Sequence, residues 1–152
     1  ERGKRNFNLA RRTLDVYARQ LRLLDEGAIT EGILPVWLPG HTPGHTGFRI
    51  TSGEQCLLIW GDIVHFPHIQ SARPDVSIVF DCDPLQAEET RKKILAQAAS
   101  EKLLVAGMHL DRSGFANVLK AGQGYRIAYR ENGRECRCAS RTGRQAKNAG
   151  HL

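Results

Sequence analysis

Residues 38–45 read Leu-Pro-Gly-His-Thr-Pro-Gly-His and are the most informative stretch of this 152-residue chain. The segment follows an apolar run, at the point where a strand is expected to end. Asp62 and His109 each come soon after a further apolar run. Imidazole and carboxylate groups are ligands that zinc and related divalent ions accept. Because residues at the ends of neighbouring strands can converge, the sequence predicts a metal site at one edge of a sheet.

Apolar spacing predicts two helices and five strands. The helix over 83–99 has the clearest start, because Asp83 can cap it and Pro84 suits its first position. Residues 8–26 repeat apolar side chains at three- and four-residue spacing, which predicts an amphipathic surface helix with one buried face. Strands are expected over 33–38, 46–50, 56–60, 103–107 and 125–129. This order of elements is typical of a layered α/β protein.

The net charge of +6 is concentrated at the ends of the chain. Residues 1–26 carry +3, residues 27–129 carry −1 and residues 130–152 carry +4. A neutral central region argues against a nucleic-acid partner, and the aperiodic final segment predicts a basic disordered tail. No run is apolar enough for a membrane helix and no signal peptide is visible, so we expect no membrane partner and take the cytoplasm as the default compartment.

The histidine and aspartate pattern resembles the metallo-β-lactamase superfamily, in which a G-H-T-P-G-H segment, a G-D pair and a late strand-end histidine recur. Residues 61–65 (Gly-Asp-Ile-Val-His), 80–83 (Phe-Asp-Cys-Asp) and 106–110 (Ala-Gly-Met-His-Leu) are similar to its methyl parathion hydrolase and lactonase-like branch. The resemblance covers residues 30–129. It implies an α/β (α+β) fold that is the C-terminal half of an αββα sandwich, with a mixed sheet and helices on one face.

Carried over by position, the resemblance implies that His45, Asp62 and His109 are metal ligands. Asp62 would be the carboxylate shared by two ions and the catalytic residue, and zinc is the expected metal. His41 and His65 are weaker candidates, which we expect to support the ligands or to face the substrate from a loop.

Two further acidic residues need no catalytic role at this point. Asp83 is explained as the helix cap, and Asp81 has no second feature in the sequence that supports a function.

The first ligand motif of this superfamily, H-x-H-x-D-H, does not occur in the sequence. Residues 1–129 are therefore expected to be a partial domain that lacks the N-terminal half and four of the seven ligands of the two-metal site. The inner face of the sheet would be uncovered, which predicts self-association. We expect this chain to be inactive alone.

The resemblance implies a metal-dependent hydrolase that uses a metal-activated hydroxide on a small ester-like substrate, such as a lactone or a phosphoester. A glyoxalase-II-like thioesterase is an alternative within the same class of enzymes. A non-catalytic binding module derived from the fold is the alternative from another class.

Overall fold

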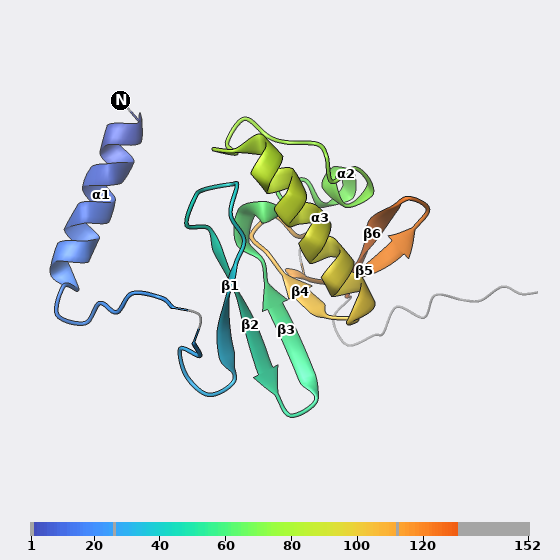
Figure 1. The fold of residues 1–152 in the computed structure, drawn as a ribbon, viewed down its shortest axis with the longest axis horizontal. Coiled ribbons are helices and arrows are strands. Elements are labelled where there is room, and N and C mark those ends of the chain that lie inside the picture. The colour runs from blue at the N-terminus through green and yellow to red at the C-terminus, as the bar shows by residue number, and fades with distance from the viewer. Residues whose placement is uncertain (1, 26, 112, 131–152) are drawn as a thin grey trace, which may run out of the picture.

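The computed structural model describes residues 2–25, 27–111 and 113–130, and its body is a six-stranded sheet (Figure 1). The strands lie side by side in chain order. All neighbouring pairs are antiparallel except β3 and β4, which are parallel. The predicted α/β class with a mixed sheet is confirmed. The strands are β1 (Ile33–Trp37), β2 (Thr46–Ser52), β3 (Gln55–Ile59), β4 (Leu104–Ala106), β5 (Phe115–Ala121) and β6 (Gly124–Tyr129).

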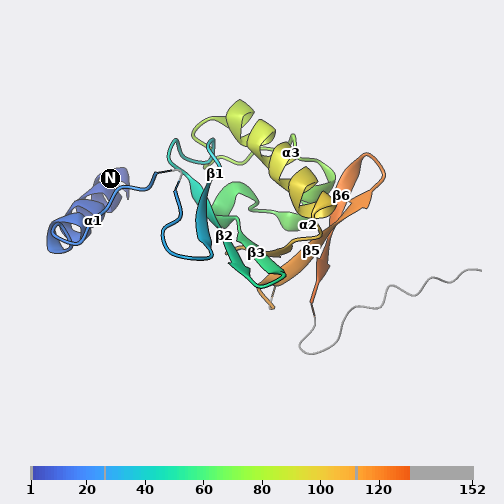
Figure 2. The ribbon, with the colours of Figure 1, turned by 60° about the horizontal axis from the view of Figure 1, so that its bottom comes forward.

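The connection between the parallel strands carries the remaining helices of the body. It contains η1 (Gly61–Ile63), α2 (Pro67–Ala72) and α3 (Pro84–Ser100). The predicted start of α3 is confirmed, because the Asp83 carboxylate accepts a hydrogen bond from the Gln86 N–H at 3.0 Å. Parallel strands require such a long crossover. Figure 2 shows α3 lying across one face of the sheet.

The hydrophobic core lies between α3 and the face of the sheet that α3 covers. Successive side chains of a strand point to opposite faces, so alternate residues enter this core. Leu58, Val105 and Ala116 stand in register across β3, β4 and β5, and each is at most 2% exposed. On the helix side the core is lined by Ala87, Ile94, Leu95 and Ala98.

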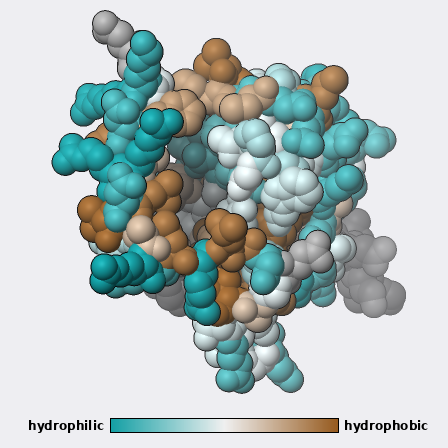
Figure 3. All heavy atoms as spheres, turned by 60° about the vertical axis from the view of Figure 1, so that its left-hand side comes forward, coloured by the Kyte–Doolittle hydropathy of each residue, from teal (hydrophilic) through white to brown (hydrophobic). Residues whose placement is uncertain are grey.

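The other face of the sheet, which we call the open face, carries apolar side chains that are only partly buried. They alternate along the strands with the core residues, and their register runs from β1 to β5. Figure 3 looks onto the side of α1 and β1 and shows hydrophobic atoms at the surface there. A sheet with one uncovered face agrees with the expectation of half a sandwich. The open face includes Ile33, Phe48, Ile50, Leu57, Ile59, Leu104 and Leu119.

The N-terminal helix differs from its prediction. Helix α1 covers Arg2–Val16 rather than residues 8–26, and every residue from 3 to 25 is exposed. Figure 1 shows α1 apart from the sheet, joined to β1 by an extended segment. The predicted buried face is therefore wrong for this structure. Amphipathic spacing indicates a helix with an apolar stripe, but it does not provide the surface on which that stripe packs.

Three elements were not predicted: the short helices η1 and α2 and the strand β5. Strand β5 alternates the buried Ala116 and Val118 with more exposed residues, but its small and polar side chains obscure the apolar pattern. Helix α2 has only six residues, which is too short for a periodic signal. The sheet gains its fifth strand from a segment that sequence reasoning treated as a loop.

Residues 131–152 of the predicted tail lie outside the described residues. Within the described part, no helix has both the length and the apolar character needed to cross a membrane.

We expect neighbouring leucines of β3 to differ strongly in their contribution to stability. Leu58 is 2% exposed in the core, whereas Leu57 is partly exposed on the open face. Leu58→Ala should lower the free energy of unfolding by about 2–5 kcal/mol, and Leu57→Ala by clearly less. Denaturant unfolding of both variants measures this difference. Equal losses would show that the open face is covered in solution.

Candidate metal centre

Two of the sequence-predicted site residues meet at the edge of the sheet. Strands β3 and β4 are parallel, so their C-terminal ends lie at the same edge. Asp62 lies in η1, directly after β3, and His109 follows β4 by three residues. The Nε2 atom of His109 is 3.4 Å from Oδ1 of Asp62. Strand-end placement therefore brings together two side chains that are 47 positions apart in the sequence.

His65 joins this pair. Its ring packs against the ring of His109 with 3.6 Å between centroids. One ligand atom from each of Asp62, His65 and His109 lies within 4.8 Å of the others. The backbone N–H of His65 donates to Oε1 of the buried Gln70 at 2.7 Å, which holds the loop in place. We call Asp62, His65 and His109 the three-residue group. The sequence had indicated His65 only as a weaker candidate that supports the ligands or faces the substrate from a loop.

The chemistry of the three-residue group suits a single divalent ion. Two imidazoles and one carboxylate form a donor set that zinc and iron accept. Two ligands at about 2.1 Å from one ion can be up to about 4.2 Å apart, so a small adjustment of the side chains would bring all three atoms onto it. Nδ1 of His65 is buried and has no hydrogen-bond partner among the described residues. An ion or a water molecule is the usual partner of a buried polar atom of this kind.

His45, the third predicted ligand, lies against the backbone of this site. Its Nε2 accepts a hydrogen bond from the Asp62 N–H at 3.0 Å, and its Nδ1 donates to the Leu38 carbonyl at 3.1 Å. Glycine at position 61 permits this approach, because a Cβ there would lie 2.7 Å from Nε2 of His45. Burial lowers the pKa of His45, and the neighbouring His41 lowers it further, so the ring is neutral. The ligand role of His45 stays a prediction.

His41 faces the second carboxylate oxygen of Asp62. Its Nε2 is 3.7 Å from Oδ2 of Asp62, and its Nδ1 is 3.0 Å from Oδ1 of Asp81. Each carboxylate oxygen of Asp62 thus has an imidazole beside it, His41 on one side and His109 on the other. The predicted supporting role of His41 remains a prediction.

The pKa of His65 is also lowered. Burial of the ring is the main cause, and the neighbouring His109 adds to it. A neutral imidazole is the form that binds a metal ion. The electrostatics of the site therefore favour the protonation state that a ligand needs.

Sequence reasoning missed Asp81 and Arg91. The Asp81 carboxylate and the Arg91 guanidinium are fully buried and lie 3.2 Å apart. Arg91 lies within the apolar stripe of α3, four residues after Ala87 and three before Ile94. A charged residue inside an apolar stripe was the signal that could have revealed this pair, because arginine is almost never fully buried without a partner.

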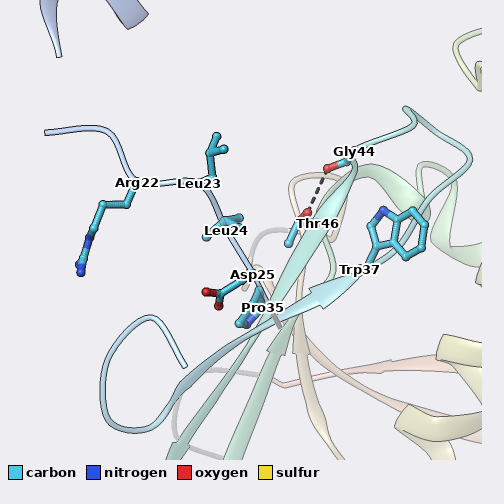
Figure 4. A pocket seen from close by; sticks show the side chains of 8 residues that line it. All are labelled: Arg22, Leu23, Leu24, Asp25, Pro35, Trp37, Gly44 and Thr46. Atoms are coloured by element: carbon cyan, nitrogen blue, oxygen red, sulfur yellow. Dashed lines mark hydrogen bonds between the residues drawn. The ribbon is translucent and has the colours of Figure 1, made fainter. Parts of the chain in front are cut away.

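A large hollow lies elsewhere on the molecule. It has a volume of about 840 Å³ and lies between the segment that follows α1 and the edge strand β1 (Figure 4). None of the three-residue group lines it. Its lining includes Leu24, Pro35 and Trp37, and it is not part of the metal centre.

Comparison with known proteins found similarity in structure only. No family model and no curated protein matches the sequence. AidC, a dizinc quorum-quenching lactonase solved with a product, is 28% identical with a TM-score of 0.73, over 78% of this chain and 40% of its own. The hydrolase AbOPH of the β-lactamase superfamily is 30% identical with a TM-score of 0.71, over 78% and 42%. A probable metal-dependent hydrolase from Staphylococcus aureus shares the fold, at 21% identity and a TM-score of 0.62, over 76% and 42%.

These structures are metallo-β-lactamase-fold hydrolases, and the mixed sheet described above is consistent with part of that fold. This chain spans less than half the length of each of them. The similarity does not single out the methyl parathion hydrolase branch.

We expect the neutral His45 to make the metal-free chain less stable in acid. Its pKa is lowered in the folded state, so the unfolded chain binds more protons. This stabilisation is complete above the ordinary histidine pKa of about 6.5 and is lost as the pH falls from there through the folded pKa. Thermal unfolding with a chelator present should show a smaller acid-induced drop for His45→Asn than for the unmodified chain. An unchanged drop in His45→Asn would refute this, and His68→Asn serves as a control.

Proposed function

We propose that this chain carries part of the metal site of a hydrolase that acts on a small ester-like substrate. The three-residue group at the ends of β3 and β4 is the observation that carries the proposal. Similarity to two hydrolases of the same fold, at 28% and 30% identity, supports the reaction class. Fold alone does not determine function, so the argument rests on the side chains of the site.

The proposed ligands are Asp62 and His109 with one further imidazole. The family resemblance favours His45 as the third ligand, whereas the geometry favours His65. When bound, a divalent ion such as zinc polarises a carbonyl or phosphoryl oxygen and makes water acidic enough to supply hydroxide near neutral pH. Asp62 would hold the ion, and His41 would support the site from the side of the second carboxylate oxygen of Asp62.

The proposed substrate is an ester-like small molecule. AidC is a lactonase, which makes a lactone the first choice for this chain, and the family resemblance of the sequence adds a phosphoester. A thioester is the alternative that the sequence left open. Because this chain is expected to be inactive alone, parallel assays with a lactone, a phosphotriester and a thioester should use the chain joined to the proposed first half of the domain.

We further propose that residues 1–129 form the second half of a two-sheet domain. The similar structures are more than twice as long as the part that this chain covers. The open face presents apolar side chains from five strands, as expected for a surface against which a first half packs. That half would carry the H-x-H-x-D-H motif and complete the site. Basic residues 130–152 are proposed to be a tail outside this domain.

Zinc analysis of the purified chain tests the ligand set. We expect at most one ion per chain, lost in Asp62→Asn, because a two-histidine, one-carboxylate set can hold a single ion. Loss of a direct ligand should weaken zinc binding by at least about tenfold. His65→Ala should therefore weaken binding more than His45→Ala if the geometry is right, and the reverse order would support the family pattern.

The matched control is His68→Ala, since His68 contacts the Tyr129 hydroxyl and not Asp62. It should bind zinc like the unmodified chain. Absence of zinc binding by the unmodified chain would contradict the proposed metal site.

The open face predicts that the isolated chain self-associates and binds hydrophobic dyes. Leu57→Glu introduces a charge at its centre and should reduce both effects. Gln123→Glu is a matched control, because Gln123 is an exposed residue of the turn between β5 and β6, outside the open face. Size-exclusion chromatography and dye fluorescence provide the measurements. A compact monomer that binds no dye would count against an uncovered sheet.

A further inference from the structure

We propose that Asp81 is a positioning residue, which fixes the ring of His41 so that a defined nitrogen faces Asp62. The inference rests on the proposed function, because Asp62 matters as the proposed metal-binding carboxylate. Asp81 touches neither the three-residue group nor a substrate position. Asp81 acts through His41, and the buried Arg91 holds Asp81 in place.

The Asp81 carboxylate is held by partners on both oxygens. Oδ2 accepts hydrogen bonds from Nη2 of Arg91 and from the backbone N–H of Ile78, both at 3.2 Å. Oδ1 is 3.0 Å from Nδ1 of His41. Its side chain is fully buried. A buried carboxylate is tolerated only when a counter-charge and hydrogen bonds satisfy it, so its position is well determined.

Arg91 links Asp81 to the segment that carries Asp62. Nε of Arg91 donates to the carbonyl of Ile63, the residue after Asp62, at 2.8 Å. Nη1 donates to the carbonyls of Pro74 and Val76 at 2.8 and 3.0 Å. Burial lowers the pKa of the Arg91 guanidinium, and the Asp81 charge opposes that effect. One guanidinium therefore holds both the η1 segment and the carboxylate that contacts His41.

The backbone around His41 is fixed separately from its ring. The N–H groups of Cys82 and Asp83 donate to the carbonyls of His41 and Gly40 at 3.0 and 2.9 Å. Gly40 has φ of 122°, and a Cβ there would lie 2.2 Å from the backbone nitrogen of Ala87, so only glycine fits. The loop is thus docked on the start of α3. What remains free is rotation of the His41 ring.

Asp81 removes that remaining freedom. A carboxylate only accepts hydrogen bonds, so Nδ1 of His41 carries the hydrogen and Nε2 presents a bare lone pair toward Asp62. Nε2 is 3.7 Å from Oδ2 of Asp62, a separation at which the two atoms can share one ion. Without this contact the ring could turn over or exchange its tautomer at little cost. Histidines near metal ions are commonly oriented by a carboxylate in this way. Asp81 and His41 have this arrangement, and Arg91 holds the Asp81 carboxylate in place.

Asp81→Asn tests the proposal while keeping the size of the side chain. Its amide oxygen can still accept from Arg91, which leaves its NH₂ group facing Nδ1 of His41. Nδ1 must then accept, so the ring hydrogen moves to Nε2. Nitrogen-15 NMR of the histidine rings, well above the ordinary histidine pKa of about 6.5, reads this change of tautomer directly. Zinc affinity, measured by competition with a coloured chelator, should fall about 10–100-fold.

His41→Asn provides a second variant in case the first does not fold. An asparagine amide can still donate to Asp81 but does not reach Asp62. It should lose zinc affinity by a similar factor with the Asp81–Arg91 pair intact. Combining both substitutions should cause no further loss, because Asp81 acts only through His41. Asp83→Asn is the matched control, since Asp83 lies in the same loop and asparagine also caps helices, and it should behave like the unmodified chain.

The outcomes separate this inference from the proposed function. If the unmodified chain binds zinc and neither Asp81→Asn nor His41→Asn weakens binding, the positioning role is wrong and the metal site stands. If Asp81→Asn weakens zinc binding as much in the His41→Asn variant as in the unmodified chain, the positioning role is also wrong. If the unmodified chain binds no zinc, the proposed metal site fails, and the NMR tautomer decides the positioning role by itself. An unchanged tautomer in Asp81→Asn overturns it, whereas a switched one supports it.

Discussion

The buried guanidinium of Arg91 is the interaction on which the site depends. It donates hydrogen bonds to three loop carbonyls and to the Asp81 carboxylate, all within the crossover between β3 and β4. These irregular segments have few ladder hydrogen bonds of their own, so a central donor has to organise them. A charge removed from water in this way is costly unless every partner is present. The crossover is consequently a specific structure rather than a loose loop. Its hydrogen bonds to Arg91 also fix the position of Asp62.

The sheet and the site are linked by one topological feature. The β3–β4 pair is the only parallel one among the six described strands, and it is the pair whose ends carry Asp62 and His109. An antiparallel pair would have placed these residues at opposite edges. The crossover that parallel strands require also supplies His65, Asp81 and α3. The crossover between β3 and β4 therefore determines both the core packing under α3 and the arrangement of the donor set.

The open face and the small size of the three-residue group are considered together. Hydrophobic side chains on the face away from α3 remain partly exposed, and the chain spans less than half of the similar hydrolases. A four-layer domain buries such a face against a second sheet. The three-residue group can satisfy one ion, and the H-x-H-x-D-H motif of the superfamily that the sequence resembles does not occur in it. Both features are the basis of the proposal that these residues form one half of a two-sheet domain.

Local sequence determined the elements with strong patterns: the capped helix α3, most strands, and the strand-end placement of His45, Asp62 and His109. It did not reveal β5, whose small residues weaken the alternation, or the exposure of α1, because a helix pattern contains no information about its partner. Only the tertiary structure decided which imidazoles approach Asp62, because hydrogen bonds between distant segments turn His45 to the backbone and hold His41 with Asp81. Those contacts depend on the way the crossover folds around Arg91, and spacing along the chain does not encode that path.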